Sequence, residues 1–300
     1  MSGAPARSPW LPTAPCTPGD RCAAHPADGT APQGRVPVAL AVLRLAAGLG
    51  TALLGILLAP AAAPLPADAR HALVRLWVRA VLRAFGVRVR VSGPPAARPG
   101  GPLLVVANHV SWLDVPLVAA VLPGRMVAKR EVRGWPVLGT LAALGGTLFI
   151  DRDRLRSLPG TVRTMAGVLA GGGRVVVFPE GSTWCGRAAG RFRPAAFQAA
   201  LDAGADIQPV RLDYRPTHAA AYVGDDPLGA SLWRIVSTRR LTAGVRLLDP
   251  LSGGRYPDRR TLAAAAQRAV ASDSANLPFS SVHQRASSSP AAASSSLTPS

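Results

Sequence analysis

Short apolar segments alternate with helical patterns from residue 87 onward, and this alternation limits the possible folds more than any other feature of the chain. The predicted strands lie at 87–92, 103–107, 126–128, 147–150, 174–178, 207–214 and 244–248. The predicted helices lie near 112–122, 136–144, 160–171, 194–203 and 261–271. Strands that alternate with helices predict an α/β domain over 87–271, with a mainly parallel sheet flanked by helices.

The segment 36–65 is the most apolar stretch of the chain. The 21 residues of Leu45–Leu65 carry no charge and are long enough to cross a bilayer core of about 30 Å. Glycines within the run are tolerated in membrane helices, whereas Pro60 and Pro64 shorten the helical part. We therefore expect membrane insertion, either as a spanning helix or as a re-entrant or monotopic hairpin. A buried core helix is the alternative.

A basic amphipathic helix is predicted directly after this run, over 67–86. At 100° per residue, Arg75, Arg79 and Arg83 share one side of the helix. The other side carries large apolar residues, namely Leu73, Val74, Trp77, Val78, Val81 and Phe85. Such a helix suits a membrane interface and would attract anionic lipids, so residues 36–86 are expected to form membrane-associated helices. An ordinary surface helix packed on the core is the alternative.

The net charge of the chain is +18, which excludes an ordinary acidic cytosolic enzyme and indicates an anionic partner. Lys129 is the only lysine among 34 basic residues, so the arginine bias of a GC-rich genome explains part of this excess.

Both ends of the chain have the composition of disordered segments. Residues 1–35 are rich in proline and lack the organisation of a signal peptide, and residues 272–300 are rich in serine. The three cysteines, Cys16, Cys22 and Cys185, cannot form a disulfide framework, so we expect a reducing compartment.

Polar side chains follow four of the predicted strands at the point where each strand ends. His109 follows the strand at 103–107, and the next exits carry Lys129, Arg152 and Glu180. Ligand sites in open α/β sheets gather beyond the carboxyl ends of the strands. We therefore expect these groups to lie along one edge of the sheet.

His109 and Asp114 are the candidate pair for proton transfer. A neutral imidazole accepts a hydroxyl proton near pH 7, and a carboxylate on its other nitrogen fixes the tautomer. Residues five apart on one helix diverge by about 140°. The pair therefore meets only if His109 lies in the turn before the helix, with Ser111 or Asn108 as the N-cap. Alternatively, His109 merely caps a helix whose first turn holds Asp114.

Four motifs now define a family resemblance. They are NHVSWLD at 108–114, GTLFIDR at 146–152, FPEGST at 178–183 and Pro209-Val210. In this order and spacing they resemble the motifs of the glycerolipid acyltransferase family, which includes 1-acyl-glycerol-3-phosphate acyltransferase. The resemblance covers about residues 86–250. It implies an O-acyltransferase of phospholipid biosynthesis that needs no bound cofactor or metal and uses acyl-CoA or acyl-acyl carrier protein as co-substrate.

The resemblance also implies roles for individual residues. His109 would be the general base, oriented by Asp114, that activates the free hydroxyl of a lysophospholipid. Arg152 would contact the acceptor's phosphate with help from Lys129. The turn that binds the acceptor would comprise Glu180, Gly181 and Ser182. The chemistry requires no serine or cysteine nucleophile, so we expect no catalytic role for Ser111 or Cys185.

One departure from the family pattern bears on the acceptor. The third motif usually continues with an arginine that binds phosphate, and Thr183 stands in its place. This form is similar to the lyso-ornithine lipid acyltransferases, whose acceptor has no glycerol phosphate. The expected acceptor is 1-acyl-glycerol-3-phosphate, with lyso-ornithine lipid as the alternative. A downstream arginine could replace the missing cation, the candidates being Arg187, Arg191 and Arg193.

Each of these assignments has an alternative without a catalytic or substrate-binding role. Arg152 could belong to a surface ion network with Asp151, Asp153 and Arg154, and Glu180 could cap the next helix. A non-catalytic lipid-binding module of the same fold is a further alternative. Nucleic-acid binding is disfavoured, because aromatic residues make up only 5% of the chain and no nucleic-acid motif is present. The expected location is the cytoplasmic face of a bacterial cell membrane.

Overall fold

The computed structural model describes residues 14, 16, 34–94, 101–135, 137–151 and 154–272. The two predicted disordered tails lie outside the described residues, apart from Ala14, Cys16, Gly34, Arg35 and Ser272.

In the described part of the chain, one sheet runs in the order β1-β7-β6-β2-β5-β3-β4, and β8 pairs with β6. The strands are β1 (Arg88–Ser92), β2 (Leu103–Ala107), β3 (Arg125–Lys129), β4 (Leu148–Ile150), β5 (Arg174–Val177), β6 (Asp206–Arg215), β7 (Thr242–Leu247) and β8 (Leu251–Ser252). The strands from β6 to β4 run parallel, whereas β7 and β8 are antiparallel to β6. The predicted α/β fold with a mainly parallel sheet is therefore confirmed.

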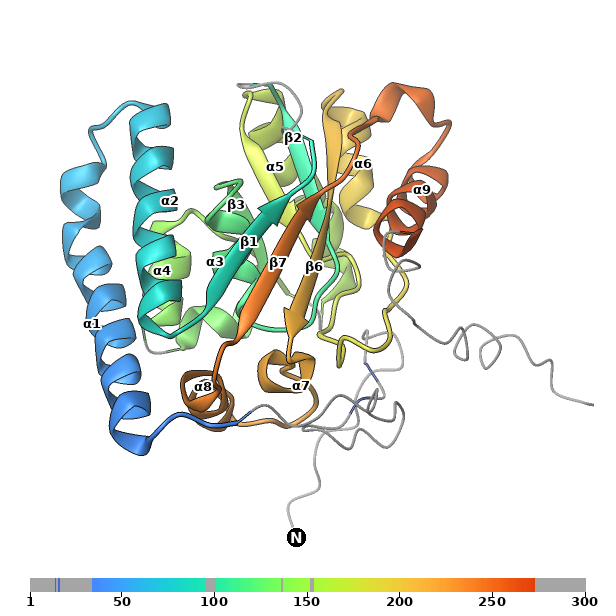
Figure 1. Cartoon of the computed structure of the whole chain (residues 1–300). Coiled ribbons are helices and arrows are strands. Elements are labelled where there is room, and N and C mark those ends of the chain that lie inside the picture. Colours follow the sequence, from blue (N-terminus) through green and yellow to red (C-terminus); the bar gives the residue numbers. More distant parts are fainter. Residues whose placement is uncertain are drawn as a thin grey trace, which may run out of the picture.

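Helices cover both faces of this sheet (Figure 1). They are α1 (Val38–Ala62), α2 (Ala67–Ala84), α3 (Asp114–Ala119), α4 (Leu138–Leu144), α5 (Leu158–Ala170), α6 (Ala195–Asp202), α7 (Thr217–Ala220), α8 (Leu228–Ser237) and α9 (Arg259–Ser272). The described residues also form three short 3₁₀ turns, η1 (Arg130–Gly134), η2 (Leu155–Ser157) and η3 (Gly253–Arg255).

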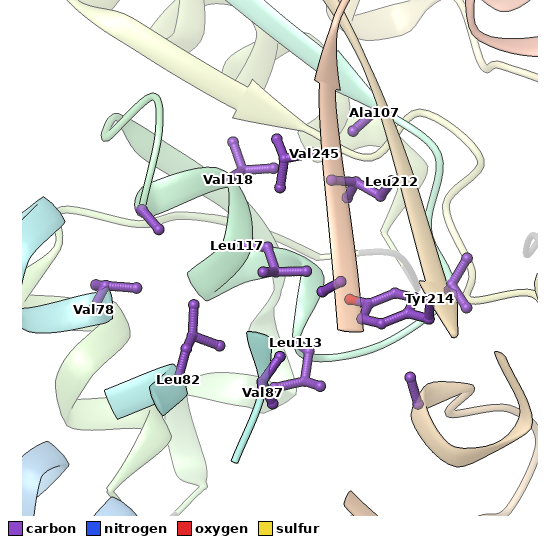
Figure 2. Close-up of a cluster of buried hydrophobic side chains, with 14 of the residues drawn as sticks. Val78, Leu82, Val87, Ala107, Leu113, Leu117, Val118, Leu212, Tyr214 and Val245 are labelled. Atoms are coloured by element: carbon purple, nitrogen blue, oxygen red, sulfur yellow. The ribbon is translucent and has the colours of Figure 1, made fainter. Parts of the chain in front are cut away.

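The central strand β2 shows how one sequence segment serves two cores. All five of its residues are buried. Leu103, Val105 and Ala107 face the cluster formed with α2, α3 and α8, whereas Leu104 and Val106 face the cluster formed with α5, α6 and α9. A parallel strand that is covered on both faces reads as a continuous apolar run, which is why LLVVA shows no alternation. Figure 2 shows the first cluster, in which Leu117 of α3 and its N-cap Leu113 lie between α2 and the strands β6 and β7.

Helices α1 and α2 form a hairpin that packs through glycines. A side chain at Gly48 would collide with the ring of Phe85, and one at Gly55 would collide with the ring of Trp77. The Trp77 indole Nε1 also donates to the Thr51 carbonyl at 2.8 Å. The glycines of the apolar run therefore let the ring of Trp77 in α2, and that of Phe85 at the C-cap of α2, approach the α1 backbone closely.

The outer face of α1 is apolar and uncovered. Its exposed large side chains are Val38, Leu40, Val42, Leu43, Leu49, Leu53, Leu54, Leu57 and Leu58. Among the described residues, α1 is the one helix long and apolar enough to cross a membrane, and only 17% of its most apolar window is buried. The alternative of a buried core helix is therefore wrong, and α1 continues through Pro60 rather than ending before it. The exposed apolar face agrees with membrane association.

The prediction for α2 is correct only in part. Arg79 and Arg83 are exposed as expected, but much of the predicted apolar side packs inside the protein, where Val78 and Phe85 are buried. Leu73 and Leu76 near the start of the helix remain exposed. An amphipathic pattern shows which side of a helix is apolar but does not show whether lipid or protein covers it.

Candidate active site

The exits of four parallel strands lie at one edge of the sheet, where β3 and β4 extend slightly beyond β2 and β5. Val106 of β2 pairs with Val177 of β5, Met126 of β3 pairs with Val176, and Lys129 pairs with Ile150 of β4. The segments that leave these strands therefore begin side by side, as the sequence predicted.

The first exit is held by the Asn108 side chain, which is buried and bonds across to β6. Its Nδ2 donates to the Leu212 carbonyl at 2.9 Å, and the Leu212 N–H donates to its Oδ1 at 2.8 Å. This pairing fixes the backbone immediately before His109.

His109 and Asp114 meet at this exit. The imidazole Nδ1 lies 2.8 Å from Asp114 Oδ2, and Asp114 is fully buried while the histidine side chain is 19% exposed. The same Oδ2 accepts the backbone N–H groups of Val110 at 2.6 Å and Ser111 at 2.8 Å. Because a carboxylate oxygen only accepts, Nδ1 carries the proton and Nε2 presents its lone pair. No described residue makes a hydrogen bond to Nε2.

The cap of α3 differs from the prediction. The helix begins at Asp114, its N-cap is Leu113, and the cap makes no side-chain hydrogen bond. The expectation that Ser111 or Asn108 serves as the N-cap is therefore wrong. Asp114 reaches back over the turn and binds its N–H groups itself, which brings the carboxylate to His109.

The other oxygen of Asp114 has a partner from a distant strand. The hydroxyl of Tyr214, near the end of β6, donates to Asp114 Oδ1 at 2.5 Å. Both side chains are buried. The sequence analysis did not identify Tyr214. The available signal was its place on the strand of the fourth motif, since strand periodicity puts Leu212 and Tyr214 on the same face.

The turn that follows β5 holds His109 from the side. The ring of Phe178 stacks on the imidazole with centroids 4.3 Å apart, and the Trp184 N–H donates to the His109 carbonyl at 2.8 Å. Gly181 in this turn has a φ of +73°, which L-residues with side chains rarely adopt. The FPEGST segment therefore packs directly against the histidine.

Glu180 lies in the interior of this turn rather than on its surface. It is 3% exposed, and neither carboxyl oxygen makes a hydrogen bond with a described residue. Burial raises its pKa well above the usual value of 4.5, and the charge of Asp114 adds to this effect. The backbone N–H groups of Gly190 and His109 and the charge of Arg211 act in the opposite direction, although neither N–H has the geometry of a hydrogen bond. Helix α6 begins only at Ala195, so Glu180 is not a helix cap.

Lys129, one of the two predicted cations, lies farther along the same edge at the end of β3. The Lys129 Nζ lies 5.3 Å from the centre of the Trp135 ring, and Arg130 pairs with Asp151 at 3.2 Å. Arg152 and Asp153 lie outside the described residues, whereas Arg154 approaches Asp151 at 4.0 Å. Asp151 is therefore paired with Arg130 and Arg154, while the alternative that an ion network holds Arg152 stays a prediction.

The remaining predicted residues lie in the segment after β5. Gly181, Ser182 and Thr183 are half-buried. Of the arginines considered as replacement cations, Arg187 is half-buried, while Arg191 and Arg193 are exposed. Cys185 is buried and forms no disulfide. Among the described residues, no group of three or more His, Cys, Asp or Glu side chains is arranged to hold a metal ion.

Comparisons with known proteins show which family the chain belongs to. A family model described as Acyltransferase matches residues 88–213. The chain is 40% identical to the lyso-ornithine lipid O-acyltransferase of Pseudomonas aeruginosa over 67% of this chain and 78% of that protein. It is 36% identical to the 1-acyl-sn-glycerol-3-phosphate acyltransferase of Neisseria meningitidis over 71% of this chain and 85% of that protein.

The fold is also similar to a solved structure. The crystal structure of PlsC, the 1-acyl-sn-glycerophosphate acyltransferase of Thermotoga maritima, superposes with a TM-score of 0.64 at 17% identity, covering 80% of this chain and 95% of that one. At this identity the likeness concerns the fold alone, whereas the two sequence relatives are close enough to assign the family. The chain therefore belongs to the acyltransferase family and is an O-acyltransferase.

Proposed function

We propose that this protein transfers a fatty acyl group from an acyl thioester to the free hydroxyl of a lysolipid, with His109 as general base and Asp114 as its orienting partner. The observation that carries the proposal is the hydrogen bond between His109 Nδ1 and Asp114 Oδ2, with Nε2 left as the acceptor on a partly exposed ring. The donor would be acyl-CoA or acyl-acyl carrier protein.

The proposed reaction needs no covalent enzyme intermediate. Nε2 takes the proton of the acceptor hydroxyl while the oxygen attacks the thioester carbonyl. The tetrahedral intermediate then breaks the C–S bond, and the leaving thiolate takes the proton back from the imidazolium. The Asp114 carboxylate stabilises the imidazolium between these steps. General base catalysis of this kind contributes about 10²–10⁴-fold.

The environment of the base favours this role. The Phe178 ring covers one side of the imidazole, and the Trp184 amide and the Asn108 side chain hold the backbone on either side of it. The position of Nε2 is therefore set by three segments of the chain. A base held in this way loses little entropy when the acceptor arrives.

The acceptor has two candidates. We propose 1-acyl-glycerol-3-phosphate, with its phosphate near Lys129 and Arg152, because Arg binds phosphate oxygens in pairs and Lys acts as a compact charge. Gly181 and Ser182 would approach the acceptor through the half-buried surface of the turn. Two observations favour lyso-ornithine lipid instead: Thr183 stands where the family has an arginine, and the relative that is 40% identical bears that name.

The family resemblance implied that Glu180 binds the acceptor, and we propose the same role here. Both of its oxygens are shielded from solvent, yet neither makes a hydrogen bond with a described residue. The carboxyl in the turn after β5 would therefore be available to a hydroxyl of the acceptor.

Membrane association would bring this site to its lipid substrate. The uncovered apolar face of α1 offers surface to acyl chains, and the exposed Arg79 and Arg83 of α2 offer charge to anionic headgroups on the cytoplasmic face.

The test uses purified full-length protein in detergent with labelled acyl-CoA and a panel of lysolipids. The wild-type protein should acylate 1-acyl-glycerol-3-phosphate, and His109→Ala should lose this activity while remaining folded. His71→Gln on α2 is the matched control. An active His109→Ala variant would refute the mechanism, and acylation of lyso-ornithine lipid alone would establish the second acceptor.

A further inference from the structure

Tyr214 makes a contact with the proposed catalytic pair that none of the four sequence motifs includes. Its hydroxyl donates to Oδ1 of Asp114, while Oδ2 of the same carboxylate faces His109 Nδ1 and two backbone N–H groups. Asp114 therefore links the phenol of Tyr214 to the imidazole of His109, and these two residues lie 105 positions apart in the sequence.

The place of Tyr214 is fixed by the same strand that holds the histidine segment. Leu212 of β6 is bound to the Asn108 side chain on both its N–H and its C=O. Tyr214 lies two residues farther along β6, and its side chain points to the same face, where Figure 2 shows it in the cluster with Leu212 and Leu113. The strand therefore aligns the phenol with Asp114.

The environment of Tyr214 favours the protonated phenol, which donates a hydrogen bond to Asp114. Burial, and after it the charge and the hydrogen bond of Asp114, raise the pKa of Tyr214 well above its usual value of 10.0. The neighbouring Asp213 acts in the same direction, while the Ser111 hydroxyl acts weakly against it. On the other side of Asp114, the turn after β5 contributes Glu180, and β6 contributes Arg211 beside it. The raised pKa favours the protonated phenol, which can donate to Asp114.

We propose that Tyr214 is a positioning residue that acts on His109 through Asp114, an inference that rests on the proposed function. Its hydrogen bond fixes the plane of the carboxylate, so that Oδ2 faces the imidazole. It also withdraws negative charge from Asp114, so that the carboxylate supports the imidazolium without holding the ring proton so strongly that Nε2 is protonated before the acceptor arrives.

The experiment measures kcat, KM and the pH profile of kcat/KM for Tyr214→Phe, which removes one oxygen and keeps the ring. Removing the donor leaves more charge on Asp114, which favours the imidazolium. We expect kcat to fall about tenfold with both KM values nearly unchanged. The acidic limb of the kcat/KM profile should move to higher pH by about half to one unit. Tyr256→Phe, whose ring packs against the cluster on the other face of the sheet, is the matched control.

A second variant tests the opposite sign. Difluorotyrosine incorporated at position 214 is a stronger donor than tyrosine, so the acidic limb should move to lower pH. An unshifted limb in both variants would overturn the proposal, and so would a Tyr214→Phe variant whose loss of kcat merely follows a loss of folded protein. If His109→Ala is inactive and Tyr214→Phe is normal, only the role of Tyr214 fails; an active His109→Ala removes the proposed function itself.

Discussion

The side chain of Asn108 continues the pairing of β2 with β6 by one residue beyond the end of the strand. The last backbone pair joins Ala107 to Val210, and the Asn108 carboxamide then exchanges two hydrogen bonds with the backbone of Leu212. The chain can therefore leave the sheet at His109 without exposing unpaired groups of β6 in the buried interior.

Replacing Asn108 should destabilise the protein. In Asn108→Ala the buried N–H and C=O of Leu212 lose their partners, at about 1–3 kcal/mol for each group. We expect the free energy of unfolding, measured by urea denaturation in detergent, to fall by about 2–6 kcal/mol, the sum for the two groups. Gln198→Ala on α6, which removes one solvent-exposed hydrogen bond to Asp202, is the control. A variant as stable as this control would show that the two hydrogen bonds contribute nothing.

Asp114→Asn should lower kcat by about 10²–10⁴-fold without a large change in either KM. The carboxamide keeps the shape of the carboxylate, but it cannot support the imidazolium and has only one oxygen to accept the N–H groups that converge on Asp114. Steady-state kinetics with labelled acyl-CoA measure the effect. Asp202→Asn, on the surface of α6, should behave like the wild type. A variant within about threefold of wild-type kcat would contradict the role of Asp114.

The raised pKa of Glu180 predicts that the stability of the protein depends on pH. Since burial raises its native pKa above the usual 4.5, the folded state holds this proton more tightly than the unfolded state does. The resulting stability is fully present below about pH 4.5 and is lost as the pH rises through the raised native pKa. Thermal unfolding of wild type and Glu180→Gln across this range measures the difference. We expect the wild type to lose stability relative to the variant as the pH rises, whereas parallel curves would mean that Glu180 titrates as it does in the unfolded chain.

A charge on the outer face of α1 should weaken membrane binding. Leu57 is 75% exposed, and a leucine that passes into acyl chains contributes about 1.5–3 kcal/mol. Leu57→Asp should therefore reduce partitioning into phospholipid vesicles by about tenfold or more, since 1.4 kcal/mol corresponds to tenfold. Sedimentation with vesicles that contain anionic lipid measures this. Gln198→Asp introduces the same charge on α6 and should not change the partitioning; equal binding of the two variants would exclude this face of α1 as the contact.

Much of the fold followed from local patterns. The compact apolar runs predicted the strands, and the motif residues indicated one edge of the sheet. Both predictions depend on residues that are neighbours in the sequence, since these determine whether a segment is buried and which side chains follow it. The pairing of His109 with Asp114 was open, since spacing alone allowed a helix on which the two diverge. The prediction of the N-cap was wrong because the Asp114 carboxylate itself accepts the hydrogen bonds of the N–H groups in the turn.

The sequence by itself determined most of the elements, which of their sides are apolar, and which residues of the motifs stand at the strand exits, whereas α7, α8 and β8 were not predicted. The tertiary structure alone decided that β6 delivers Tyr214 to Asp114, that Phe178 covers His109, and that Glu180 lies inside its turn. It also decided that the apolar side of α2 meets protein while that of α1 remains open. Periodicity records that a side chain is apolar or polar, whereas the group it meets depends on strand order and register, which bring together residues about a hundred positions apart.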